Sequence, residues 1–385
     1  MGQPSTVIVG GGIAGLATAW GLARAGAGPV TVLEREASLG FWSSGRNAGI
    51  LRSAIPATAT RQLALRSEAR YHDLPLELVR HAPGPIFDAV GMVLCEGAPG
   101  LPAPLWWEDF EALGAVEAWS PAQLQTRVPY YQPEGTRAWW MPRAGRIQVS
   151  NLMTALERAC LELGVQFRLG TRVQGLMHDD VGHITGVRLE DRSEQAADRV
   201  VLAPGAFVAR FAEDLGVAFP ARTTRRHLFY ALPNGPWSPK DPVVWDDAAG
   251  FYFLGTENGE LLLSLCDGDD ADPEHLLADP LLARLAERRV QESLAALGPF
   301  DWKRRLVGIR TVSEDDVPVL GAHPGHPNLY WVAALGGHGI TLSLALAELA
   351  CDLIEGRSLP HRLQAALAFD SPERDFQTQR DYRPL

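Results

Sequence analysis

Apolar runs separated by glycine turns divide the chain into short strands and helices. The apolar run 6–9 is followed by glycines at 10, 11, 12 and 15, and residues 16–25 then have the composition of a buried helix. A second apolar run over 30–33 ends at Glu34. Strand, glycine turn, helix and strand in this order form one βαβ unit, which predicts a parallel sheet.

Further along the chain, the pattern alternates between helical and strand-like periods. Helices are expected over 58–71, 149–164 and 281–297, and after the glycine turn at 336–339. Strands are expected over 91–95, 165–167, 171–173, 184–189 (as hairpin partner of the previous two), 199–202, 228–230, 251–254, 261–265, 317–321 and 329–333. From 84 to 142, prolines, tryptophans and short strand-like pieces replace the helical pattern, which indicates a second domain.

Two apolar stretches have almost the length of membrane segments. The N-terminal one has no basic region before it and contains several glycines. The uncharged one from 329 to 347 is interrupted by glycines, so a strand, a turn and a buried helix fit it better. We therefore expect no targeting segment and no transmembrane helix.

Length, charge and cysteine content limit the expected number of domains, the binding partners and the cellular location. A chain of 385 residues exceeds one comfortable core and favours two domains. The net charge of -11 offers no basic surface for nucleic acid or an anionic membrane. Because Cys95, Cys160, Cys266 and Cys351 lie far apart, we expect no disulfide, no metal site and a cytoplasmic location.

The first glycine turn is typical of a nucleotide pyrophosphate site. Gly10, Gly12 and Gly15 form a G-x-G-x-x-G pattern, which allows a tight turn, close approach of phosphate and close helix packing. Glu34 ends the second strand, where a carboxylate accepts hydrogen bonds from ribose hydroxyls. An incidental surface acid beside an ordinary βαβ unit is the alternative. Because Glu34 would repel a 2′-phosphate, FAD or NAD is favoured over NADP.

Three later segments are also candidates for contact with a ligand. The small and polar residues 41–49 read as a loop that meets a ligand. The turn 203–206 follows an apolar strand, where backbone can approach a nucleotide. The third segment, 336–339, is a glycine turn before a long apolar helix.

With these motifs in this order, nearly the whole chain resembles the D-amino-acid oxidase family of flavoenzymes, which includes glycine oxidase, sarcosine oxidase and D-arginine dehydrogenase. The resemblance implies an α/β fold. A Rossmann-like, glutathione-reductase-like FAD-binding domain would be interleaved with an α+β substrate domain built on a mixed, largely antiparallel sheet. The expected FAD-binding segments are 1–83, 146–220 and 305–370, the substrate-binding segments are 84–145 and 221–304, and 371–385 is a tail.

The resemblance implies FAD as the cofactor. The cofactor-binding residues are then expected to be Gly10, Gly12, Ile13, Ala14, Gly15, Glu34, Arg35, Ser43, Ser44, Arg46, Asn47, Ala48, Gly49, Val173, Ala203, Gly205, Arg310, Gly336, Gly337, His338, Gly339, Ile340 and Thr341. The N-terminal amides of the long helix would face the flavin pyrimidine and stabilise negative charge. No cysteine stands near Gly321 and no histidine near Ser43, so the FAD is expected to be non-covalent.

The resemblance also implies an arginine and a tyrosine that hold the substrate carboxylate. They match Arg310, within 308–311, and Tyr252, within 251–253. A guanidinium binds a carboxylate through two charge-assisted hydrogen bonds, and a tyrosine hydroxyl adds a third. A surface cation is the alternative for Arg310, and a core aromatic for Tyr252. His338 and Arg52 are further catalytic candidates, with a packing residue and a solvated charge as their alternatives.

The chain departs from the D-arginine dehydrogenase pattern around the substrate. Gly91 stands where an acid is expected, and Ile50, Arg52 and Ile55 stand where polar residues are expected. A cationic side chain would lack its partner, and the two isoleucines suggest an apolar wall. Residues 45–53 look closer to sarcosine oxidases, including the larger subunit of heteromeric amine oxidoreductases.

These features predict an FAD-dependent amine oxidoreductase acting on the C–N bond of a small amino acid: a D-amino acid, glycine or an N-methyl amino acid. Hydride transfer to flavin N5 would leave an imine that hydrolyses to an oxo acid. The alternatives are an FAD-dependent 2-hydroxy acid dehydrogenase and the flavin subunit of a heteromeric amine dehydrogenase complex. Oxygen or a quinone is the expected electron acceptor, and the chain is otherwise expected to be a monomer or homodimer.

Overall fold

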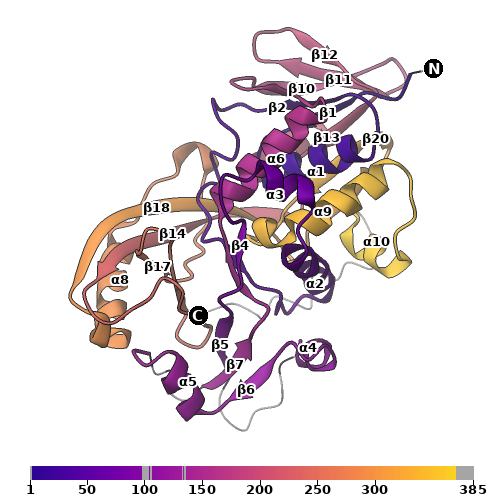
Figure 1. Cartoon of the computed structure of the whole chain (residues 1–385). Helices are drawn as coiled ribbons and strands as arrows, with labels where there is room; N and C mark the ends of the chain where they lie inside the picture. The colour runs from indigo at the N-terminus through magenta and orange to yellow at the C-terminus, as the bar shows by residue number, and fades with distance from the viewer. Residues whose placement is uncertain (1, 98–103, 105, 132, 134–135, 370–385) are drawn as a thin grey trace.

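The computed structural model describes residues 2–97, 104, 106–131, 133 and 136–369. The tail expected at 371–385 lies outside the described residues. The described chain has two halves, each built on a sheet. The long strands β14 (Ala221–Pro233) and β18 (Phe300–Ser313) extend from one half toward the other (Figure 1).

A six-stranded sheet forms the first half, in the order β19-β20-β13-β1-β2-β9. Its strands are β1 (Thr6–Val9), β2 (Val30–Leu33), β9 (Gln166–Arg168), β13 (Arg199–Leu202), β19 (Val319–His323) and β20 (His326–Ala333). β1 pairs in parallel with both β2 and β13, and only the edge strand β19 is antiparallel to its neighbour. The predicted parallel βαβ unit is therefore confirmed.

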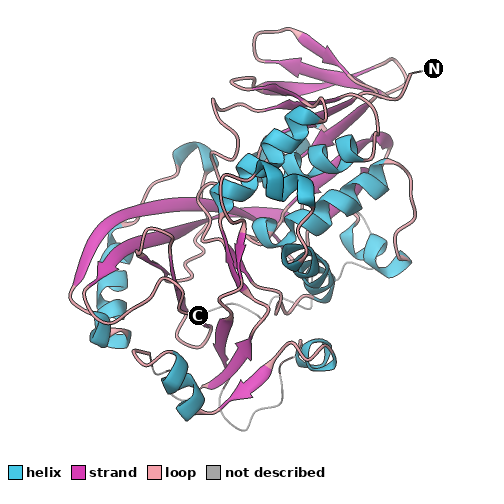
Figure 2. Ribbon diagram, viewed as in Figure 1, coloured by secondary structure: helices cyan, strands magenta, loops and turns pink. Residues whose placement is uncertain are grey.

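Helices cover one face of this sheet and a small sheet covers the other (Figure 2). The helices include α1 (Ile13–Arg24), α6 (Val149–Glu162) and α9 (Gly339–Ile354); the small sheet contains β10 (Val173–His178), β11 (Ile184–Leu189) and β12 (Glu194–Ala196). Successive strand residues alternate between the two cores. Ile8 packs against the helices, whereas Val7 and Val9 pack on the small-sheet side.

An eight-stranded, largely antiparallel sheet forms the second half, in the order β18-β14-β17-β16-β15-β5-β7-β6. Its other strands are β5 (Met92–Glu96), β6 (Glu117–Trp119), β7 (Arg137–Met141), β15 (Val243–Asp246), β16 (Phe251–Gly255) and β17 (Leu261–Ser264). The sequence pattern missed β18, because its first half is rich in exposed charged residues. The domain boundary expected after residue 304 falls inside this strand, which stays in the sheet to Ser313.

The two faces of the eight-stranded sheet have different neighbours. Phe229, Phe251 and Phe253 belong to an aromatic core on one face. Leu228 and Tyr252 belong to the core on the opposite face. Because side chains alternate along a strand, residues 224, 226 and 228 of β14 share a face with Tyr252. This face is turned toward the six-stranded half.

The remaining elements are helices α2 (Thr58–His72), α3 (Leu76–His81), α4 (Trp107–Ala112), α5 (Pro121–Arg127), α7 (Val208–Asp214), α8 (Pro280–Ser293) and α10 (His361–Leu367), and a sheet of β3 (Ile50–Leu51), β8 (Gly145–Ile147) and β4 (Phe87–Asp88). Two expectations need correction. The strand expected at 165–167 pairs with β2 instead of the 184–189 hairpin. The helix expected to reach 297 ends at Ser293, and a 3-10 turn follows.

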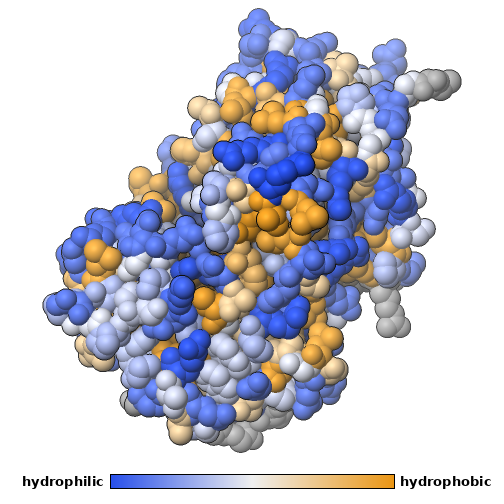
Figure 3. All heavy atoms as spheres, in the orientation of Figure 1, coloured by the Kyte–Doolittle hydropathy of each residue, from blue (hydrophilic) through white to orange (hydrophobic). Residues whose placement is uncertain are grey.

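No helix in the described part of the chain combines the length and the apolar character needed to span a membrane. The apolar stretch 329–347 is divided between β20 and α9, as expected. The surface facing the viewer in Figure 3 is mainly hydrophilic, with a group of hydrophobic residues near its centre. All four cysteines are free thiols.

Candidate active site between the two sheets

A long cavity runs from the carboxyl ends of β1 and β2 to the inner face of the eight-stranded sheet. Carboxyl ends of parallel strands are where ligands bind in open α/β sheets. The atom-free space in the cavity is about 1740 Å³, including the part open to solvent. It is lined by residues of the glycine turn at one end and by Arg310 and Tyr252 at the other.

At one end of the cavity, the glycine turn exposes its backbone because Gly10 and Gly12 have no side chains. Gly10 has a φ of +108°, and a Cβ there would lie 2.3 Å from the carbonyl oxygen of Ala203. A Cβ at Gly15 would lie 1.9 Å from the carbonyl oxygen of Gly10, so Gly15 allows α1 to pack on β1 and does not line the cavity. At Gly12, the nearest atom would be Ser44 Oγ at 3.4 Å. Gly12 thus faces open space, as a phosphate cradle requires.

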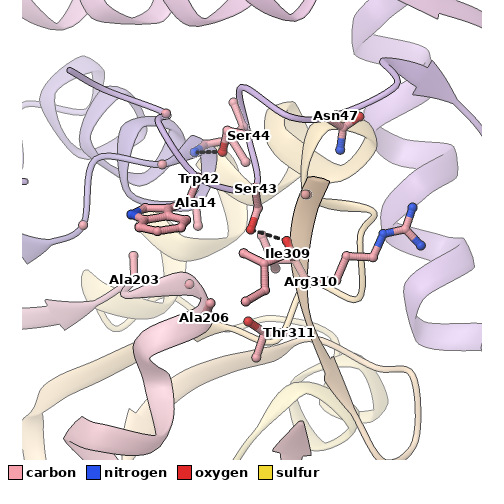
Figure 4. A pocket seen from close by; sticks show the side chains of 18 of the residues that line it. Ala14, Trp42, Ser43, Ser44, Asn47, Ala203, Ala206, Ile309, Arg310 and Thr311 are labelled. Atoms are coloured by element: carbon pink, nitrogen blue, oxygen red, sulfur yellow. Dashed lines mark hydrogen bonds between the residues drawn. The ribbon is translucent and has the colours of Figure 1, made fainter. Parts of the chain in front are cut away.

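The loop 41–49 joins the start of α1 to β18. Ser44 Oγ accepts a hydrogen bond from the Ile13 amide at 2.9 Å, and Ser43 Oγ donates to the Ile309 carbonyl at 2.5 Å (Figure 4). Arg46 donates to the carbonyl of Val307 at 3.1 Å. The expected ligand loop is therefore held against the strand that carries Arg310.

Glu34 and Arg35 lie where β2 ends. The Glu34 carboxylate accepts hydrogen bonds from the Gly11 amide at 2.7 Å and the Glu36 amide at 2.9 Å. Burial raises the pKa of Glu34. Arg35 stacks over Phe207 at 4.3 Å and forms an ion pair with Glu274 at 3.2 Å. Each carboxylate oxygen of Glu34 can accept one more hydrogen bond, from a ligand in the cavity.

Nearly all the expected cofactor-binding residues line this one cavity, although they come from segments far apart in the sequence. Gly15 and Gly49 are the two exceptions. Gly49 has a φ of +69°, and a Cβ there would lie 2.3 Å from the carbonyl oxygen of Ile147. Its role is to allow the turn into β3. Of the two isoleucines expected to form an apolar wall, Ile50 lines the cavity, whereas Ile55 packs in the core.

Arg310 and Tyr252 lie at the end of the cavity opposite the glycine turn. Ile309 and Arg310 leave β18 on opposite sides (Figure 4), and Arg310 shares a face with Arg226 and Tyr252. Within the described residues, the Arg310 side chain has neither an ion pair nor a hydrogen-bond partner. Removal from water, and then the neighbouring Arg226, lower the pKa of Arg310 to about 10. Arg310 is thus a cation at neutral pH that faces the cavity.

Arg52 also reaches this end of the cavity, but it is already paired. It is 9% exposed, donates to Asp247 at 3.2 Å and stacks over Trp245 at 4.2 Å. A second hydrogen bond joins Arg52 to the Ala54 carbonyl. The interpretation of Arg52 as a solvated charge is therefore wrong.

His338 immediately precedes helix α9 and lines the cavity. Its Nδ1 is buried without a hydrogen-bond partner among the described residues. Burial, followed by the charges of Arg52, Arg310 and Arg226, lowers the pKa of His338 to about 3. His338 is therefore neutral at physiological pH and is a very weak base.

Sequence reasoning missed several residues of the site. Arg226, Leu228 and Trp245 line the end near Arg310, and Phe207 lines the part nearer the nucleotide turn. Trp42 lines the same part; it lies within the expected ligand loop 41–49 but was not named as a site residue. Trp42 contacts Phe207 edge to face, with ring centroids 5.6 Å apart. The alternation of β14 could have grouped 226 with 228, but the register with β18 is needed to bring Arg226 beside Arg310.

Comparisons with known proteins agree over most of the chain. The model of the DAO family, described as FAD dependent oxidoreductase, matches residues 5–353. Glycine oxidase of Pseudomonas putida is 26% identical over 91% of this chain and 94% of its own length. The bifunctional tRNA 5-methylaminomethyl-2-thiouridine biosynthesis protein MnmC of Verminephrobacter eiseniae is 26% identical over 94% of this chain but 62% of its own length.

A solved structure shares the fold. The glycine oxidase of Geobacillus kaustophilus superposes with a TM-score of 0.82 and 21% identity, covering 95% of this chain and 99% of that chain. The family match includes both the glycine turn at the nucleotide end and the arginine at the opposite end. The chain belongs to the DAO family of FAD-dependent oxidoreductases, as its sequence motifs predicted.

Proposed function

We propose that this protein uses FAD to oxidise the C–N bond of a small amino acid. A D-amino acid, glycine and an N-methylated amino acid are the candidate substrates. The observation that carries the proposal is Arg310, a cation without a counter-ion among the described residues, placed beside Tyr252 at the end of the cavity opposite the glycine turn.

The residues along the cavity fit FAD. Gly10 and Gly12 leave room for the pyrophosphate, and Glu34 would accept the ribose hydroxyls. The amides of Gly339, Ile340 and Thr341 begin α9 without a capping side chain, so they remain available to an acceptor. FAD bound here would accept two electrons and a proton equivalent from the substrate.

Arg310 and Tyr252 would hold and orient the substrate. The guanidinium can form two parallel hydrogen bonds with a carboxylate. Burial raises the pKa of Tyr252, so its hydroxyl stays protonated and can donate a third bond. Fixing the carboxylate determines where the α-carbon and the amine lie, which is the main contribution expected of the protein chain.

The neutral His338 is unsuited to removing a proton from an ammonium group. Its pKa near 3 lies far below that of an amine, so we assign it to packing at the helix start. The positive charges of Arg226 and Arg310 favour loss of the substrate's ammonium proton to solvent. The amine would then be neutral when the C–N bond is oxidised.

The similarity to the glycine oxidase of Pseudomonas putida supports a small amino-acid donor. A 2-hydroxy acid would satisfy the same carboxylate clamp, so a 2-hydroxy acid dehydrogenase is the alternative function. A further proposal is that the chain is the flavin subunit of a heteromeric amine dehydrogenase. Anaerobic mixing of the FAD-loaded protein with glycine, D-alanine, N-methylglycine and lactate tests the donor. Bleaching of the flavin by an amine supports the proposal, whereas bleaching by lactate alone, or by none of them, overturns it. Reoxidation in air then distinguishes an oxidase from a quinone-linked dehydrogenase.

A further inference from the structure

Arg226 is a buried cation that the carboxylate clamp does not use. It lies on β14, and the described structure contains no hydrogen-bond partner for its buried Nε and Nη1 atoms. Both atoms belong to a side chain that lines the cavity. Buried donors of a charged group are expected to have acceptors, and a ligand can supply them where the protein does not.

The strand register places this second guanidinium beside the first. Arg226 pairs with Gly308, and Arg310 pairs with Thr224, in the antiparallel ladder of β14 and β18. Arg226 and Arg310 are therefore diagonal neighbours on one face, a relation that separates backbone positions by roughly 7–8 Å. Two guanidinium groups at this spacing can each bind a separate carboxylate of one short molecule.

Neighbouring groups do not neutralise Arg226. Asp247 is paired with Arg52, and Asp267 is occupied by the amide and Nδ1 of His227. Cys266 lies close to Arg226, but burial raises the pKa of its thiol, so it does not supply an anion.

The acids along the cavity do not compensate either. Among the described residues that line it, Glu34 is the only carboxylate, and it lies at the nucleotide end. Three guanidinium groups, those of Arg52, Arg226 and Arg310, border the substrate end. One of them has a carboxylate partner, so this end carries an excess of positive charge.

We propose that the substrate carries a second acid group and that Arg226 binds it, while Arg310 binds the carboxylate next to the oxidised carbon. The substrate class is a short dicarboxylic amine, whose two carboxylates are separated by three or four bonds. Aspartate and N-carboxymethylglycine have this form. The oxidation itself rests on the proposed function, whereas the second carboxylate site can be tested by binding alone.

The first experiment measures binding by perturbation of the flavin absorbance. Succinate carries two carboxylates, and butyrate has the same chain length with one. We expect the FAD-loaded protein to bind succinate about tenfold or more tightly than butyrate, the effect of one added charged hydrogen bond. In Arg226→Gln this ratio should fall close to one, and Arg226→Lys should restore part of it.

Arg225→Gln is the matched control. It removes the same charge from the neighbouring position of the same strand, but Arg225 is on the opposite face and is paired with Asp269 and Asp279. Its succinate preference should equal that of the unchanged protein. Equal binding of succinate and butyrate by the unchanged protein, or an equal loss in both arginine variants, would overturn the proposal.

The second experiment compares kcat/KM for matched substrates, in both enantiomers where they exist. Aspartate is paired with asparagine, and N-carboxymethylglycine with N-methylglycine. The acid should be preferred in each pair, and Arg226→Gln should abolish the preference. A uniform decrease with every substrate would contradict the second-carboxylate role. If no compound reduces the flavin, the proposed oxidation fails, and the succinate measurement still decides the binding site.

Discussion

Gly337 lies against Arg310, and this contact allows a test of the carboxylate clamp without replacing the arginine. A Cβ at Gly337 would lie 2.7 Å from Nε, 2.9 Å from Cδ and 2.9 Å from Cζ of Arg310. These atoms belong to a flexible side chain, so Gly337→Ala should displace the guanidinium and leave the fold intact. The backbone φ of +84° at Gly337 adds a cost of ~1–2 kcal/mol for any L-residue.

The size of the effect follows from the hydrogen bonds at risk. Losing one charge-assisted bond of ~1.5–3 kcal/mol corresponds to roughly a 10- to 150-fold decrease in kcat/KM. Steady-state kinetics on the best amino-acid substrate measure it, and the flavin-to-protein absorbance ratio checks that FAD is retained.

Gly336→Ala is the comparison variant. Its φ is +58°, and a Cβ there would contact only His338 Nδ1 at 3.5 Å, so it introduces backbone strain without the collision. Any loss in Gly336→Ala therefore measures strain, and the excess loss in Gly337→Ala measures the displaced arginine. Equal losses in the two variants, or unchanged kcat/KM in Gly337→Ala, would refute the assignment of Arg310 to the substrate.

Three other perturbations have defined outcomes. Gly10→Ala should abolish FAD retention, seen as a lower flavin-to-protein absorbance ratio, because its Cβ would lie 2.3 Å from the backbone oxygen of Ala203; normal retention would contradict the cradle. His338→Asn should leave the apparent pKa values of the kcat/KM profile unchanged between pH 5 and 9, because His338 is neutral above its pKa of about 3; loss of an ionisation in that range would disprove this. Burial, and then Asp247, raise the pKa of Glu96 to about 7, so the folded state binds this proton more tightly than the unfolded state. The free energy of unfolding should therefore decrease as the pH rises from the unfolded pKa of about 4 toward 7. Glu96→Gln should flatten this decrease in urea-unfolding experiments, and an unchanged slope would show that Glu96 is not responsible.

The local motifs of the chain could be predicted from the sequence because each is contained in a short segment. The run 6–9, the glycines from Gly10 to Gly15 and the run ending at Glu34 form one βαβ unit by their order alone. Arg310 and Tyr252 were found through a resemblance carried by segments of three or four residues. The sequence pattern did not predict β18, because a strand with many exposed charged residues lacks the apolar alternation that predicts strands.

The sequence by itself determined the family and the FAD cofactor, and it predicted Arg310 and Tyr252 as the carboxylate-binding pair. Only the tertiary structure decided which charges meet at the substrate end. Arg52 is neutralised by Asp247, which is 195 residues away in the chain, whereas Arg226 has buried donors without partners beside Arg310. The physical reason is that strand register and sheet order determine neighbours across a sheet, whereas alternation within one strand specifies only which residues share a face.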